Sequence, residues 1–84
     1  MSSPLTGVSP LLSIIAALDD PDPNHVAAAA RIIHGHCQAS EESRVSYRAL
    51  GAISALLAAL TRHRPHADVQ EAACWALRWI GKDA

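Results

Sequence analysis

Apolar side chains recur every three or four residues along most of the chain, beginning with Leu11, Ile14, Ile15 and Leu18. This spacing places them on one side of an α-helix. Proline and glycine interrupt the pattern, and no segment alternates apolar and polar residues for long enough to predict a strand. The pattern therefore predicts an all-α protein with five helices, at about residues 9–18, 24–39, 40–50, 52–62 and 67–81.

The residues at the helix starts suggest how the first three helices begin. We expect Ser9 to cap the first helix, because Pro10 follows it at a position where a missing N–H costs nothing. Asn24 and Ser40 are the expected caps of the second and third helices. The run Asp19–Pro23 contains two prolines, which end the first helix.

The composition fits thin helices that pack closely. Half of the residues are apolar, much of that half is alanine, and phenylalanine is absent. Alanine is the best helix former, and its small side chain lets helices approach one another. The expected core stripes of the later helices are Val26, Ala29, Ala30, Ile33 and Cys37; Val45, Tyr47, Ala49 and Leu50; Ile53, Leu56, Leu57 and Leu60; and Val69, Ala73, Ala76, Leu77 and Ile80.

The charge and cysteine content suggest a cytoplasmic protein, with a nuclear location also possible. The formal net charge is −1 and the basic residues are spread along the chain, so we expect neither a nucleic-acid nor a membrane partner. Cys37 and Cys74 lie in apolar helical segments and are expected to be buried free thiols. Met1–Pro10 lacks the features of a signal peptide.

The two halves of the chain resemble each other. Ile15–Leu18 matches Leu57–Leu60 at an offset of 42 residues. Val26 matches Val69 at an offset of 43, and Ala30 matches Ala73 at the same offset. A period of about 40–45 residues made only of helices is typical of armadillo and HEAT solenoids.

Two segments carry a closer resemblance to the armadillo repeat. Arg44–Leu57 is similar to its first helix, glycine turn and second helix, and Val69–Ile80 is similar to its third helix, including Trp75-Ala76-Leu77. The resemblance implies an α-solenoid segment of about one and two-thirds repeats, with a disordered tail at 1–8, a partial repeat of two helices at 9–39 and a full repeat at 40–84. Because about three repeats are normally needed for stability, a homo-oligomer, a required partner or a longer solenoid is expected.

Trp75 and Trp79 are four residues apart and share one side of the last helix, rotated away from its core stripe. The resemblance implies that this side lines a concave groove. In the nuclear-import adaptors of the superfamily an asparagine follows the tryptophan by four residues, but here that position is Trp79, so basic nuclear-localisation peptides are not expected. Burial of the indoles against a neighbouring chain, or within this chain, remains open. The candidate partner-binding residues are Trp75, Trp79, Ile32, His36, Ala72 and Arg78.

No metal, cofactor, small-molecule substrate or catalytic activity is expected. His34 and His36 lie about 200° apart on a helix and cannot converge on one ion. No nucleophile or carboxylate has an activating partner at a known motif spacing. Arg44 and Arg48 lie four residues apart on one helical face, which is expected to be solvated, with an acidic partner or a phosphate as the alternative. The acidic loop at 19–22 and the basic residues at 62–64 could match one another between chains.

The sequence leaves two functions open. The first is a scaffold or adaptor module that binds a partner peptide or helix around the tryptophans. The second is a structural unit that self-assembles through the same face, or a fragment of a longer armadillo solenoid.

Overall fold

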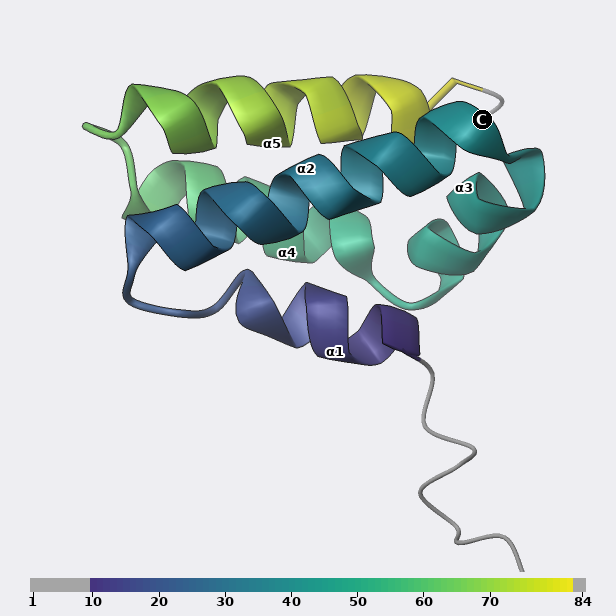
Figure 1. Ribbon diagram of the computed structural model, residues 1–84, viewed down its shortest axis with the longest axis horizontal. Helices are drawn as coiled ribbons and strands as arrows, with labels where there is room; N and C mark the ends of the chain where they lie inside the picture. The colour runs from purple at the N-terminus through teal and green to yellow at the C-terminus, as the bar shows by residue number, and fades with distance from the viewer. Residues whose placement is uncertain (1–9, 83–84) are drawn as a thin grey trace, which may run out of the picture.

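The computed structural model describes residues 10–82, which form five helices and no strand (Figure 1). They are α1 (Pro10–Ala17), α2 (Pro23–Ala39), α3 (Glu41–Ala49), α4 (Ala52–Arg62) and α5 (Ala67–Ile80). The prediction of an all-α chain with five helices is confirmed. The expected tail at 1–8 and the expected cap at Ser9 lie outside the described residues.

The helices form two antiparallel hairpins that lie against each other. One hairpin is α1 with α2 and the other is α4 with α5, and the two long helices, α2 and α5, run side by side in the same direction (Figure 1). The most extensive packing in the described chain is between α2 and α5. The short helix α3 crosses at one end and contacts α2, α4 and α5. The core therefore lies between the hairpins, along α2 and α5.

Five of the six buried positions of α2 recur in α5, 43 residues later. All five predicted core positions of α2 are buried, and each has a buried counterpart in α5. Most of these residues are small, which lets the two helices approach closely. The matched pairs are Val26 with Val69, Ala29 with Ala72, Ala30 with Ala73, Ile33 with Ala76, and Cys37 with Ile80.

The start of α2 differs from the prediction. Asp22, not Asn24, is the N-cap, and its Oδ1 accepts a hydrogen bond from the backbone N–H of Asn24 at 2.9 Å. Pro23 decides this, because proline is favoured at the first helical position and a capping residue must precede it. The predicted cap of α3 is confirmed, since Ser40 Oγ accepts from the N–H of Ser43 at 3.2 Å.

The two arginines of α3 tie the ends of α2 and α5 together. Arg44 Nη1 donates to the carbonyl of Cys37 at 2.6 Å, and Arg48 Nη1 donates to the carbonyl of Ile80. Carbonyls in the last turn of a helix lack intrahelical donors, so cationic donors are favourable there. The expectation of a solvated arginine face is therefore wrong, because both side chains are half-buried against helix ends.

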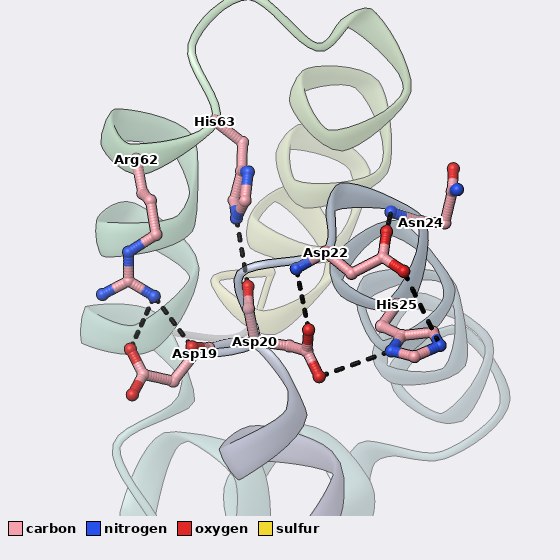
Figure 2. Close-up of polar contacts among 7 residues, drawn as sticks. All are labelled: Asp19, Asp20, Asp22, Asn24, His25, Arg62 and His63. Atoms are coloured by element: carbon pink, nitrogen blue, oxygen red, sulfur yellow. Dashed lines mark hydrogen bonds and ion pairs between the residues drawn. The ribbon is translucent and has the colours of Figure 1, made fainter.

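The loops at the other end of the hairpins contact each other (Figure 2). Arg62 Nη1 lies 2.6 Å from Asp19 Oδ1 and donates to the Asp19 carbonyl at 3.0 Å. His63, only 5% exposed, places Nε2 3.2 Å from the Asp20 carbonyl oxygen. The acidic and basic loops thus meet within one chain, whereas the sequence suggested a match between chains. The reason is that the stacked hairpins bring their loops side by side.

Asp20 organises the loop before α2. Its Oδ1 accepts from the N–H of Asp22 at 2.7 Å, and its Oδ2 lies 3.3 Å from Nδ1 of His25 (Figure 2). These hydrogen bonds, first the one from Asp22 and then the one with His25, hold the pKa of Asp20 below its ordinary value. The carboxylates of Asp20 and Asp22 therefore stabilise the conformation of this loop by accepting hydrogen bonds within it and from the start of α2.

Several predicted core positions are exposed. Val45 is 50% exposed and Leu57 is 51% exposed, and Ala49 is also exposed. In α3 a single residue, Tyr47, is buried, because α3 meets its neighbours with one narrow side. Cys37 is a buried free thiol as predicted, but the prediction is wrong for Cys74, which is exposed. In residues 10–82 no helix has the length and apolar character needed to cross a membrane.

Candidate partner-binding surface

The outer side of α5 exposes large side chains because its inner side is committed to the core. Val69, Ala73 and Ala76 are fully buried. Because each helical residue turns by about 100°, the positions on the opposite side of the helix point outward, and Glu71, Cys74 and Arg78 are exposed there. Trp75 is 44% exposed on this outer side, and Trp79 is half-buried beside it.

His34 of α2 contacts both tryptophans. Its ring stacks on that of Trp75 with centroids 5.8 Å apart and an interplanar angle of 29°, and it lies 6.4 Å from Trp79. Sequence reasoning missed this histidine. Its position one turn beyond Ala30 was the available signal, because Ala30 lies on the buried side of α2.

Each indole also carries a cation from α5 or the turn that follows it. The Arg78 guanidinium lies over the Trp75 ring, 5.3 Å from its centroid. Lys82 Nζ lies 4.7 Å from the centroid of the Trp79 ring. Both distances are within the range of a favourable cation–π contact. The indoles are therefore held in a cationic surrounding supplied by the chain itself.

An open groove of about 660 Å³, which we call the Trp75 groove, runs along the outer side of α5. Its apolar part comes from Pro65, Ala67, Cys74 and Trp75. Gln70 lies at its edge and donates to the carbonyls of Leu60 and His63, both at 3.0 Å, which fixes the preceding loop. The full lining is Arg64, Pro65, Ala67, Gln70, Glu71, Cys74, Trp75 and Arg78.

The structure brings together three of the six candidate residues, Trp75, Trp79 and Arg78. The prediction is wrong for Ala72, which is 6% exposed because it lies on the core stripe of α5. Ile32 lies in a different hollow beside α1.

His36 is also directed away from the tryptophans. Its Nδ1 lies 2.7 Å from the hydroxyl oxygen of Tyr47 in α3, and the two form a hydrogen bond. The prediction that His36 and Ile32 lie beside the tryptophans is therefore wrong. Both residues lie on the side of α2 opposite His34, whereas His34 is the residue that contacts the tryptophans of α5.

A second apolar hollow, of about 300 Å³, lies between α1 and α2. Ile14 and Ala17 line it and are half-buried, although their counterparts 42 residues later, Leu56 and Ala59, are buried in α4. Ile32, which is 45% exposed, forms its rim. Equivalent positions of the two hairpins thus differ in burial: they are partly exposed in α1 and buried in α4.

The described part of the chain contains no group of three or more His, Cys, Asp or Glu side chains that could hold a metal ion. Comparisons with protein-family models, with curated proteins and with solved structures each found no match to this chain. Among residues 10–82, the Trp75 groove combines an exposed indole with an open volume of about 660 Å³, which is the surface best suited to hold a ligand.

Proposed function

We propose that this protein is a protein-interaction module of the armadillo-like helical-repeat class, which binds a partner peptide or helix in the Trp75 groove. The observation that carries the proposal is a 44% exposed indole that opens onto a groove of about 660 Å³. Tryptophan is among the residues that contribute most to protein–protein binding, and a fixed ring loses little entropy on binding. His34 and Arg78 both contact this ring.

The repeat-like layout supports the armadillo-like part of the proposal. The buried pattern of α2 recurs in α5 at an offset of 43 residues, within the period of about 40–45 residues of such repeats. The paired hairpins place α2 and α5 side by side (Figure 1). Proteins of this class bind partners on the surface formed by successive inner helices.

Affinity capture from cell extract tests the proposal. The bait proteins are the wild type, Trp75→Ala, Trp75→Ala/Trp79→Ala, and Val45→Ala as a control at an exposed position on α3. We expect a specific partner to be retained by the wild type and by Val45→Ala, and lost in both tryptophan variants. Far-ultraviolet circular dichroism checks that the variants are folded. Equal recovery on all four baits would refute a role for the groove.

Self-assembly is a second candidate function, and the uncovered α1–α2 hollow favours it. Covering the apolar side chains of Ile14 and Ile32 would be favourable, and a second copy could supply the cover. Sedimentation velocity of the wild type and of Ile32→Glu tests this. An oligomer that dissociates in Ile32→Glu supports self-assembly, whereas a wild-type monomer across the accessible concentration range contradicts it.

A further inference from the structure

We infer that the segment bound in the Trp75 groove is acidic and carries a bulky apolar side chain. This inference rests on the proposed function and names the chemistry of its partner. It follows from three features of the described surface: the cations on the indoles, the charges along the groove, and the apolar floor between them.

The cations on the two indoles disfavour a basic partner. An exposed indole normally attracts a lysine or arginine from a partner, but here Arg78 lies over Trp75 and Lys82 lies over Trp79. A basic segment would have to displace these side chains and then lie next to them. Like charges placed together in an interface cost binding free energy and exclude wrong partners.

The charges along the groove favour carboxylates. Arg64 and Arg78 line it, and neither forms an ion pair with a carboxylate of residues 10–82. Glu71 is the one acidic side chain in the lining, while Asp68 lies in a separate hollow near Asn24. The groove therefore has an excess of positive charge, although the whole chain has a formal net charge of −1.

Arg78 is also prepared to bind a carboxylate. A guanidinium that lies over a ring can still donate two parallel hydrogen bonds from its N–H groups to one carboxylate. The contact with Trp75 fixes the guanidinium and reduces the entropy lost on binding. From the start of α5 at Ala67 to Arg78 is about 16 Å at 1.5 Å per residue. A partner segment of about three helical turns would span that length.

The floor of the groove requires an apolar group as well. Pro65, Ala67, Cys74 and the exposed part of Trp75 present an apolar surface between the two arginines. A purely acidic segment would leave this surface in contact with water, whereas a leucine or an aromatic side chain would cover it. Charge would set the choice of partner and the apolar contact would supply much of the affinity.

Binding of three fluorescently labelled peptides to the full chain tests the inference. The peptides share one length and the same leucine positions, and their remaining positions are glutamate, glutamine or lysine. Fluorescence polarisation gives the affinity, and the quenching of tryptophan reports directly on the site because Trp75 and Trp79 are the two tryptophans of the chain. We expect the glutamate peptide to bind at least about tenfold more tightly than the lysine peptide, with an affinity that falls as salt rises.

Two variants locate the effect. Arg64→Gln should weaken binding of the glutamate peptide by about three- to tenfold, the range of a rim charge contact. Arg31→Gln, at an exposed arginine of α2 that does not line the groove, should leave it unchanged. Equal losses in the two variants would show nonspecific attraction and would overturn the inference.

The peptide result also separates this inference from the proposed function. Tighter binding of the glutamine or lysine peptide would overturn the acidic assignment while leaving a binding groove in place. Binding of none of the three peptides would overturn the assignment too. The proposed function itself is judged separately, by whether the tryptophan variants lose the captured partner.

Discussion

Helices α2 and α5 are alike on the inside and different on the outside. Their buried residues correspond at five positions, from Val26 and Val69 to Cys37 and Ile80. The exposed residues at the same offset do not correspond: Ala28, Arg31 and Ile32 of α2 stand where α5 has Glu71, Cys74 and Trp75. The shared positions build the fold, because two close-packed helices require small apolar contacts. We therefore expect the exposed positions that differ, and not the shared buried ones, to determine which partner binds.

The loops before α2 and α5 also differ, but their difference is structural. The acidic loop contributes Asp19 and Asp20, and the basic loop contributes Arg62 and His63. These residues contact one another across the two hairpins (Figure 2). The ion pair of Arg62 with Asp19 and the contacts of Arg62 and His63 with the Asp19 and Asp20 carbonyls lie between the two hairpins. On the outer side of α5, by contrast, Arg64 and Arg78 form no ion pair with a carboxylate of the described chain.

One cysteine lies on the buried side of α2 and the other on the exposed side of α5, so the two should react at very different rates with a thiol reagent. Burial raises the pKa of the Cys37 thiol, whereas Cys74 is exposed in the Trp75 groove. Because the thiolate is the reactive form and Cys37 can be reached only by opening of the fold, we expect Cys74 to react on the order of a hundredfold faster or more. A time course with a chromogenic disulfide, repeated on Cys74→Ser, measures both rates. Similar rates in the native protein would contradict the burial of α2.

Two adjacent isoleucines of α2 provide a matched test of inside against outside. Ile33 is fully buried and Ile32 is 45% exposed. Ile33→Ala leaves a cavity and should lower the free energy of unfolding by about 2–4 kcal/mol. Ile32→Ala removes the same atoms from the surface and should cost less than about 1 kcal/mol. Urea unfolding followed by circular dichroism gives both values, and equal costs would show that the helix is rotated from the position described.

Tyr47 tests the junction of α3 with the long helices. Tyr47→Phe removes the hydrogen bond with His36 and should cost about 1 kcal/mol at neutral pH. Burial, with a smaller contribution from Cys37, raises the pKa of Tyr47 to about 12 from an ordinary value of 10.0. A raised folded-state pKa means that the unfolded chain loses the proton first. The stability that the protonated Tyr47 hydroxyl contributes is therefore complete below pH 10 and is lost as the pH rises toward 12.

Urea unfolding of both proteins at neutral pH and above pH 10 measures this effect. The wild type should lose more stability than Tyr47→Phe across that interval, because only the wild type carries the Tyr47 hydroxyl. If the two proteins lose the same amount, the Tyr47 hydroxyl is not buried as described.

The loop contact should have the smallest effect. The side chains of Arg62 and Asp19 are 44% and 80% exposed, and exposed ion pairs contribute about 0–1 kcal/mol. Asp19→Asn should therefore cost less than about 0.5 kcal/mol at low salt, and nothing measurable at high salt. Arg62→Ala should cost more, because it also removes the donor to the Asp19 carbonyl. A larger effect for Asp19→Asn than for Arg62→Ala would contradict this geometry.

The sequence correctly predicted those features that are determined within a single helix, such as its buried side. The spacing of Val26, Ala30 and Ile33 gave the buried stripe of α2, and the spacing of Trp75 and Trp79 placed both indoles on one side of α5. These results need only the geometry of a single helix. The expectation that the indoles bind a partner remains a prediction.

The sequence could not predict what depends on how two helices meet. Helical periodicity does not say which neighbour covers a stripe, so Val45, Leu57 and Cys74 were assigned to the core although they are exposed. The contact of His34 with Trp75 joins residues far apart in the chain and requires the alignment of α2 with α5. The prediction of Asn24 as the cap of α2 was wrong for a local reason, since Asp22 is also a good capping residue and directly precedes Pro23 at the first helical position.

Nuclear magnetic resonance mapping of the glutamate peptide onto the isotope-labelled chain tests most directly whether the outer side of α5 is the binding surface. We predict that the shifted backbone amides cluster at Arg64–Arg78 and around His34, and that those of α1 and α4 stay unchanged. Shifts centred on the α1–α2 hollow instead, with the amides around Trp75 unaffected, would contradict the assignment of the Trp75 groove.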